Sequence, residues 1–253
     1  MSAWSGVAYD SVAVPQARWG EDVLARLSVG PACRVLDAGC GPGQVTELLL
    51  RRHPDVTVVA LDATESMLDQ ARLRLAPFAE RVQFVLGDLE GNHLADALGG
   101  QPVDAVFSTG TFHWVLDHRR LFRQLATVLN PGGTLVAQCG GAGSLAAVRA
   151  ILDDLGVDWR SHNSYADADE TAHHLRAAGF RDVWTWLAPA PVEFADRTAL
   201  ADFLAAGALT PYLANRPSSD QRALCEAVAE QLDAPILDFV RLNILARGPT
   251  AER

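Results

Sequence analysis

The stretch VLDAGCGPG at residues 35–43 decides the fold of this chain. Residues 34–37, RVLD, are a candidate for a short strand, and the residues that follow at 44–52 are amphipathic at helical spacing. Between the two lie glycines spaced by one residue: Gly39, Gly41 and Gly43. The pattern therefore predicts a strand, a glycine-rich loop and a helix.

Such a loop has two explanations. Small residues let the backbone approach a ligand closely, and the first N–H groups of the following helix can bind a carboxylate or a phosphate. The alternative is a plain tight turn. Asp62 favours the ligand, because it follows the apolar run VTVVAL, nineteen residues past Gly43, where a carboxylate can accept hydrogen bonds from both ribose hydroxyls. The loop and Asp62 together predict a nucleoside-binding site.

The sixth position of the loop separates two kinds of nucleoside-binding fold. A dinucleotide-binding loop has the pattern G-x-G-x-x-G or G-x-G-x-x-A. Here that position is Gln44, and the third glycine comes one residue early. The loop therefore argues against a nicotinamide-dependent oxidoreductase, which a change in NADH absorbance would reveal.

Short apolar runs alternate with amphipathic stretches along the chain, which indicates a doubly wound α/β fold with a mostly parallel sheet covered on both faces. The expected strands are 34–37, 56–61, 82–86, 104–107, 134–139, 182–187 and 237–246. The expected helices are 44–52, 65–75 with Thr64 as its cap, 119–129, 145–155 and 171–178, and NPGG at 130–133 reads as a turn. The organisation predicted is an N-terminal helical cap (1–30), a cofactor-binding core (31–189), a helical lid (190–235), and a last strand with a tail (236–253).

Composition narrows the class of protein. The 253 residues include 31 acidic and 21 basic side chains, for a net charge of −10, which disfavours a nucleic-acid partner. No apolar run reaches membrane-spanning length, and the N-terminus lacks a secretory pattern. The four cysteines form no C-x-x-C pair and are expected to be reduced. We expect a cytoplasmic enzyme with a small-molecule substrate, no membrane partner, and a monomeric or small homo-oligomeric state.

Five motifs follow one another along the chain. They are VLDAGCGPG at 35–43, VVALDATESML at 58–68, FVLGDLE at 84–90, DAVFSTGTFHWVLDH at 104–118 and LNPGGTLVAQCGG at 129–141. In this order and spacing they resemble the class I S-adenosylmethionine-dependent methyltransferases over nearly the whole chain. Within that class the chain is most similar to the trans-aconitate methyltransferase group, through the HW of FHW, GGAG at 140–143, HHLRAAGF at 173–180 and FVRLNILARG at 239–248.

The resemblance implies a seven-stranded sheet, S-adenosyl-L-methionine as cofactor, and a set of binding residues. Those expected around the methionine end are Asp37, Gly39, Cys40, Gly41, Gly43, Gln44, Ser108 and Thr109. Those expected around the adenosine are Asp62 at the ribose, Ala63 and Met67 beside the adenine, Asp88 at its amino group and Leu89 through its backbone N–H. The chemistry agrees, because a carboxylate accepts from an exocyclic amine and adenine favours apolar walls.

His113 is the candidate catalytic residue. It follows the fourth expected strand, beside the expected position of the reactive methyl group. Methyl transfer chiefly requires alignment of the nucleophile in a dry cleft. A carboxylate nucleophile is already ionised and needs no base, whereas a hydroxyl or amine can need one. His113 is therefore a positioning group, a base, or a packed residue beside Trp114, and the sequence leaves the three open.

No metal-binding or nucleophilic role is expected for the remaining histidines or for the cysteines. His118 lies at a polar helix start and is expected at the surface, as are His173 and His174. No histidines or carboxylates stand at metal-ligand spacing, so no metal is expected. Cys40 suits the loop by its small size, and no neighbouring base indicates an activated thiol.

The large side chains outside the motifs also allow two interpretations each. Trp4, Tyr9 and Trp19 would form an N-terminal flap over the cofactor or fasten a first helix to the sheet. Trp184 and Trp186 alternate in a strand and fit packing on the sheet. Three arginines in or near the lid, Arg160, Arg216 and Arg222, would bind a tri-acid or form an ordinary solvated face, the second being the default.

The function predicted is methyl transfer from S-adenosylmethionine to a small molecule, with an acid such as trans-aconitate as the substrate that the resemblance implies. A natural-product O-, N- or C-methyltransferase is the alternative, because lids vary among such enzymes. A protein that binds the cofactor without transferring methyl is another, because the motifs indicate binding and not turnover.

Overall fold

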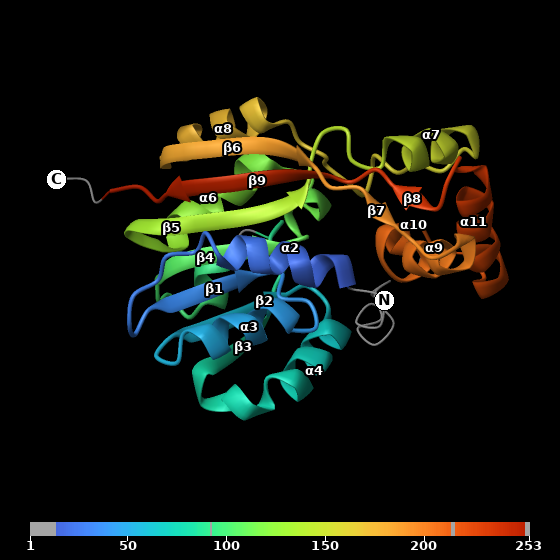
Figure 1. Ribbon diagram of the computed structural model, residues 1–253. Helices are drawn as coiled ribbons and strands as arrows, with labels where there is room; N and C mark the ends of the chain where they lie inside the picture. The colour runs from blue at the N-terminus through green and yellow to red at the C-terminus, as the bar shows by residue number, and fades with distance from the viewer. Residues whose placement is uncertain (1–13, 92, 214–215, 251–253) are drawn as a thin grey trace.

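A seven-stranded sheet in the order β3-β2-β1-β4-β5-β9-β6 forms the centre of the molecule (Figure 1). The computed structural model describes residues 14–91, 93–213 and 216–250. The strands are β1 (Arg34–Ala38), β2 (Thr57–Asp62), β3 (Val82–Leu86), β4 (Val103–Thr109), β5 (Leu129–Gly140), β6 (Arg181–Pro189) and β9 (Val240–Arg247). Neighbours from β3 to β5 pair parallel, whereas β9 is antiparallel to β5 and β6. The strand order reverses between β1 and β4, which confirms the doubly wound sheet and marks its switch point.

Helices cover both faces of the sheet, which is why its central strands are continuously apolar. One face carries α2 (Val14–Leu24), α3 (Gln44–Arg52) and α4 (Glu65–Arg74). The other carries α5 (Leu94–Ala97), α6 (His118–Val128) and α8 (Ala168–Ala177). Short 3₁₀ turns, η1 (Ala76–Arg81) and η2 (Phe112–Trp114), connect the layers.

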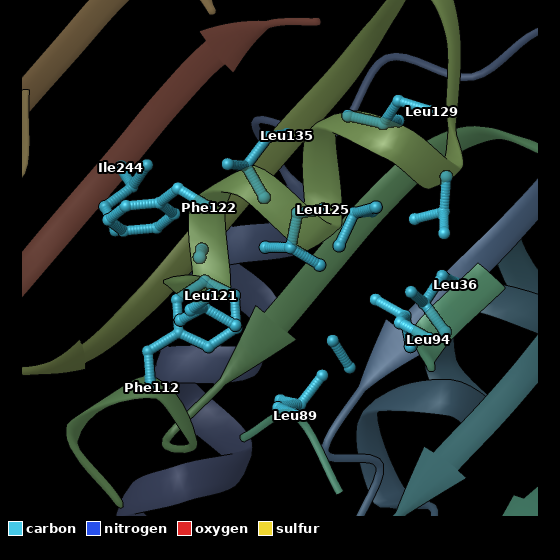
Figure 2. Close-up of a cluster of buried hydrophobic side chains, with 14 of the residues drawn as sticks. Leu36, Leu89, Leu94, Phe112, Leu121, Phe122, Leu125, Leu129, Leu135 and Ile244 are labelled. Carbon is cyan, nitrogen blue, oxygen red and sulfur yellow. The ribbon is translucent and has the colours of Figure 1, made fainter. Parts of the chain in front are cut away.

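The core under α6 also anchors the loops that follow the strands. Leu121, Phe122 and Leu125 of α6 point onto the sheet (Figure 2). Phe112 and Leu89, from the segments after β4 and β3, are buried in the same cluster. Complete burial of such side chains contributes roughly 1.5–3 kcal/mol each. The segments at the carboxyl ends of these strands are therefore held by the core.

A second group of helices has its own core beyond the ends of β5, β6 and β9 (Figure 1). It consists of α7 (Ala146–Asp154), α9 (Arg197–Phe203), the π-helical turn η3 (Leu204–Ala208), α10 (Thr210–Leu213) and α11 (Ser218–Gln231), with a two-stranded ribbon of β7 (Val192–Glu193) and β8 (Ile236–Leu237). Trp19 of α2 packs into this core. The helices over 190–235 thus share a core with α7, which comes from an earlier part of the chain.

Two strands differ from the sequence expectation. The predicted turn at 130–133 lies inside β5, where Val103 pairs with Leu129 but Ala105 pairs with Thr134, so the extra residues form a bulge. The predicted strand 237–246 is divided into β8 and β9. The remaining strands lie within a few residues of their predicted positions.

The expectation that Trp184 and Trp186 pack on the sheet is wrong. The two residues are 69% and 38% exposed. β6 is the edge strand, and Val183 and Leu187, which alternate with the tryptophans, are the residues that pack against the core. The guanidinium of Arg26 lies 5.2 Å from the Trp186 ring centre. In the part of the chain that the structure describes, no helix is both long and apolar enough to cross a membrane.

Candidate active site

A cavity of about 330 Å³ opens at the carboxyl ends of β1, β2, β3 and β4, at the switch point of the sheet. Ten of the predicted cofactor residues line it: Gly39, Cys40, Gly41, Gln44, Asp62, Ala63, Met67, Asp88, Leu89 and Thr109. Open α/β sheets bind ligands at this place. The structure therefore brings together, around one cavity, residues that are up to seventy positions apart in the sequence.

The glycine loop has the backbone geometry that its composition requires. Gly39, Gly41 and Gly43 all have positive φ, at 86°, 52° and 83°, a region that side chains with a Cβ rarely adopt. A Cβ on Gly39 would stand 2.2 Å from the Thr111 hydroxyl oxygen, whereas one on Gly41 would meet nothing within 4 Å. The space beside Gly41 is therefore open cavity, and the loop is more than a tight turn.

Asp62 holds the loop from the end of β2. Its Oδ2 accepts the N–H of Gly41 and its Oδ1 accepts the N–H of Thr64, both at 2.9 Å. Burial raises the pKa of this carboxyl, and the hydrogen bonds from Gly41 and Thr64 oppose that rise. A carboxylate has about four acceptor positions. Asp62 can therefore support the loop and still accept hydrogen bonds from a ligand.

Three predicted residues lie behind the cavity instead of lining it. Asp37 is buried at the end of β1, where its Oδ2 accepts the Thr46 hydroxyl at 2.5 Å and burial raises its pKa to about 7. Its Oδ1 has no hydrogen-bond partner among the described residues. Ser108 donates its hydroxyl to the Ala38 carbonyl at 2.6 Å. Gly43 starts α3, and a Cβ there would approach Ala71 at 3.3 Å.

Several lining residues were not anticipated from the motifs. Glu90, Thr111, Trp114 and Val115 all face the same cavity. Glu90 accepts the N–H of Leu116 at 2.6 Å and so ties the loop after β3 to the loop after β4. These residues belong to the same motifs as the predicted site residues, and this closeness in sequence is the feature from which they could have been predicted.

A smaller cavity, of about 50 Å³, adjoins the first and shares Gly110 and Trp114 with it. Its other described walls come from the sheet and the second helical group: Trp19, His113, Gly140, Ser144, Leu145, Tyr165, Phe203, Ala208, Phe239 and Arg241. Most of this lining is aromatic or small. A compact group bound here would lie directly beside a ligand in the larger cavity.

His113 lies in the wall of the smaller cavity and is buried. Its Nδ1 accepts the backbone N–H of Gly140 at 3.3 Å, and its ring stacks on Tyr165 with centroids 5.7 Å apart. Burial, and then the charge of Arg241, lower the pKa of His113 well below its ordinary value. The imidazole is therefore neutral at pH 7, and because Nδ1 accepts a hydrogen bond, the proton resides on Nε2.

His118 is not at the surface, contrary to the expectation from sequence. Its side chain is buried, with Nε2 2.8 Å from the carbonyl oxygen of Phe112. Burial lowers its pKa. The helix start is polar because Asp117 caps α6 by accepting the N–H of Arg120 at 2.9 Å, while His118 turns inward. His174 is also partly covered, with 15% of its side chain exposed, whereas His173 is exposed.

Arg241 is a cation in the wall of the smaller cavity, and it was not among the predicted site residues. Its side chain is buried, and its guanidinium carbon lies 4.1 Å from the Trp19 ring centre. The sequence feature that could have indicated a buried polar site is an arginine and an asparagine at alternate positions, 241 and 243, of a mostly apolar strand.

The arginines considered for acid binding lie elsewhere and fit the solvated interpretation. Arg160 pairs with Asp153 at 2.6 Å, Arg222 pairs with Asp202 and Glu226, and Arg216 is exposed.

The remaining expectations concern the N-terminus, the thiols and metals. Trp4 and Tyr9 lie outside the described residues, and Trp19 packs edge-on against Phe239 at 5.1 Å. All four cysteines are free, and burial raises the pKa of Cys40 well above its ordinary value. Within the described ranges, no group of three or more His, Cys, Asp or Glu side chains is arranged to hold a metal ion.

The fold and the site define a class. Residues 35–133 match the family described as a methyltransferase domain. Among the solved structures that share the fold is phosphoethanolamine N-methyltransferase 2 of Haemonchus contortus in complex with S-adenosyl-L-methionine. Its TM-score is 0.63, with 19% identity over 97% of this chain and 56% of that one. The YcgJ protein of Bacillus has a TM-score of 0.64 at 16% identity, over 92% of this chain and all of its own. One curated methyltransferase is also more than 30% identical over nearly the whole chain, so this chain belongs to the S-adenosylmethionine-dependent methyltransferase family, and S-adenosylmethionine is its cofactor.

One relative is similar over the full length and another over part of it. The chain is 31% identical to trans-aconitate 2-methyltransferase of Methylobacterium nodulans, over 98% of this chain and 99% of that protein. It is 35% identical over 182 residues to malonyl-[acyl-carrier protein] O-methyltransferase of Methylococcus capsulatus, which covers 71% of this chain and 64% of that one.

Proposed function

We propose that the enzyme transfers the methyl group of S-adenosylmethionine to a carboxylate oxygen of a small acid, of which trans-aconitate is the first to test. The observation that carries the proposal is a pair of buried donors, His113 and Arg241, in the small cavity beside the cofactor cavity. The name of the full-length relative, trans-aconitate 2-methyltransferase, supports the same substrate.

The larger cavity fits the cofactor. The open space beside Gly41 accepts the methionine end, and the buried carboxyl of Asp37, with its pKa near 7, would be stabilised in its ionised form by the cofactor's positive charge. Gly39, Cys40, Gly43, Gln44, Ser108 and Thr109 shape this end of the site. Asp62 binds the ribose hydroxyls, Ala63 and Met67 contact the adenine, and Asp88 and Leu89 bind its edge.

The acid would be held by groups that donate hydrogen bonds. Arg241 offers a planar, permanently charged fork that matches a carboxylate. His113 offers its Nε2 proton, because Nδ1 already accepts the Gly140 N–H. If His113 were to act as a base through Nε2, its proton would have to lie on Nδ1, opposite the N–H donor of Gly140. The geometry therefore supports a positioning role for His113.

The chemistry requires no base for such a substrate. S-adenosylmethionine supplies an electrophilic methyl group on a sulfonium, and a carboxylate is ionised at neutral pH. The protein has to align the carboxylate and exclude water. Phe203 and Ala208 of the second helical group, together with Phe239, provide apolar walls of the small cavity. We infer that this group, 190–235 together with α7, acts as the lid, over a core that spans most of residues 31–189 and the last strand.

Incubation with methyl-labelled cofactor and a panel of metabolites tests the proposal. The panel should contain trans-aconitate, related mono-, di- and tri-acids, and hydroxylated or aminated compounds of the same size, with mass spectrometry locating the label. A labelled methyl ester of an acid is the expected product. Label on a hydroxyl, nitrogen or carbon acceptor, with none on any acid, would refute it.

A further inference from the structure

A chain of hydrogen-bonded side chains runs behind Arg241. Gln138 of β5 and Asn243 of β9 face each other in the antiparallel register, and both are buried. Gln138 Nε2 donates to Asn243 Oδ1 at 2.9 Å, and Arg241 Nε donates to Gln138 Oε1 at 3.4 Å. Arg26 of α2 donates from Nη1 to the same Asn243 oxygen at 2.8 Å. The side chain of Arg241 is thus connected to α2 through two amides.

The partners determine which way each amide points. Asn243 Oδ1 accepts from two donors, and Asn243 Nδ2 donates to the Arg241 carbonyl at 3.1 Å. Gln138 must therefore present its NH₂ to Asn243, because an oxygen there would face another oxygen. Its Oε1 is left for the guanidinium of Arg241. The orientation of Gln138 follows from the chain of donors and needs no ligand.

Arg241 lies between two spaces, which makes its orientation consequential. It lines the small cavity, and together with Trp19 it also lines an open groove of about 880 Å³. Gln138, Asn243 and Arg26 line that groove as well. Trp19 covers one side of the guanidinium at 4.1 Å, and Gln138 holds its Nε. The hydrogen bond from Arg241 Nε to Gln138 limits the directions in which this long, flexible side chain can turn.

We propose that Gln138 is a positioning residue, which holds the guanidinium of Arg241 toward the small cavity, while Asn243 and Arg26 hold Gln138. This inference rests on the proposed role of Arg241 in binding the acid. Gln138 itself does not line the small cavity among the described residues and acts through Arg241.

The test combines Gln138→Met with Arg241→Met in a double-mutant cycle. Methionine keeps the length of glutamine and removes its hydrogen bonds. Gln138→Met should raise KM for trans-aconitate roughly 3–10-fold, as expected for one hydrogen bond of moderate strength, and leave kcat within about two-fold. In the Arg241→Met background it should cause no further change. Gln101→Met, at an exposed glutamine, is the matched control.

Two further measurements keep the test decisive. Titration of trans-aconitate into the enzyme loaded with S-adenosylhomocysteine reports binding without turnover, and S-adenosylhomocysteine affinity and melting temperature report the fold. If Gln138→Met does not fold, Asn243→Ser breaks the same chain and should weaken acid binding in the same direction.

The outcomes separate the two proposals. An unchanged KM in Gln138→Met, or an equal rise in both backgrounds, overturns the positioning role and leaves the acid site standing. An unchanged KM in Arg241→Met overturns both. If no acid is methylated, the proposed function fails, and the binding titration then decides whether Gln138 still acts on acid affinity.

Discussion

Substitution of His113 separates a hydrogen-bond donor from a base. Alanine removes the ring that stacks on Tyr165 and the Nε2 proton, whereas glutamine keeps an N–H donor of similar reach. A hydrogen bond to a charged group contributes about 1.5–3 kcal/mol. His113→Ala should therefore raise KM for trans-aconitate roughly 10–150-fold with a small change in kcat, and His113→Gln should recover part of that loss.

Steady-state kinetics and a binding titration together measure the effect. KM reports affinity only when chemistry is slow relative to dissociation, so trans-aconitate should also be titrated into enzyme loaded with S-adenosylhomocysteine. A general base would contribute roughly 10²–10⁴-fold to kcat. A fall of that size in kcat for both variants, with unchanged affinity for the acid, would refute the donor role. Unchanged constants in His113→Ala would mean that the ring only packs.

Three further predictions concern the cofactor cavity. Asp62→Ala should weaken S-adenosylmethionine binding by about 1.5–3 kcal/mol; unchanged affinity in a folded variant, measured by calorimetry, would contradict the ribose assignment. Gly41→Val places a side chain in open space at a positive φ of 52° and should abolish cofactor binding while the fold survives. Gly99→Val is the control for backbone strain, because Gly99 also has a positive φ and lies beside open space. Burial raises the pKa of Asp37 to about 7 in the folded protein, so its contribution to stability is complete below about pH 4 and is lost as the pH rises to about 7. Asp37→Asn removes this carboxyl, so its effect on the free energy of unfolding of the ligand-free protein should be more stabilising at pH 8 than at pH 4, by about 2–4 kcal/mol. Equal shifts in melting temperature at the two pH values would show that ionised, buried Asp37 does not destabilise the fold.

The cofactor half of the site was predictable because its residues lie in short motifs attached to consecutive strands. A strand, a loop of glycines and an acid at the end of the next strand define both the sheet and its switch point. Ten of the thirteen predicted residues line the cavity. The other three, Asp37, Gly43 and Ser108, lie behind it, since a linear motif does not show which side of the backbone faces the ligand.

The errors have a common physical origin, which is long-range packing. Trp184 and Trp186 were expected to pack because alternation indicates a covered face, but β6 lies at the sheet edge. His118 was expected at the surface because its neighbours are polar, but its ring turns inward to the Phe112 carbonyl. Neither the strand order nor the direction of one side chain at a helix start follows from local pattern.

Of the two buried donors in the small cavity, His113 was predicted as a site residue and Arg241 was not, for a related reason. Arg241 stands in the last strand, which inserts between β5 and β6 and so brings residue 241 beside residue 113.

The two cavities meet at Gly110 and Trp114, which line both of them. In the proposed reaction, the methyl group would pass from the cofactor to the acid at this point. Gly110 has a positive φ of 69°, and its N–H donates to the Gln138 carbonyl at 2.8 Å. The backbone of Gln138 thus contacts Gly110, which lines both cavities, while its side chain contacts Arg241. Gln138 therefore contacts both Gly110, beside which methyl transfer would occur, and Arg241, which would hold the acid. Alignment of the acid with the cofactor and recognition of the acid would thus depend on the same residue of β5.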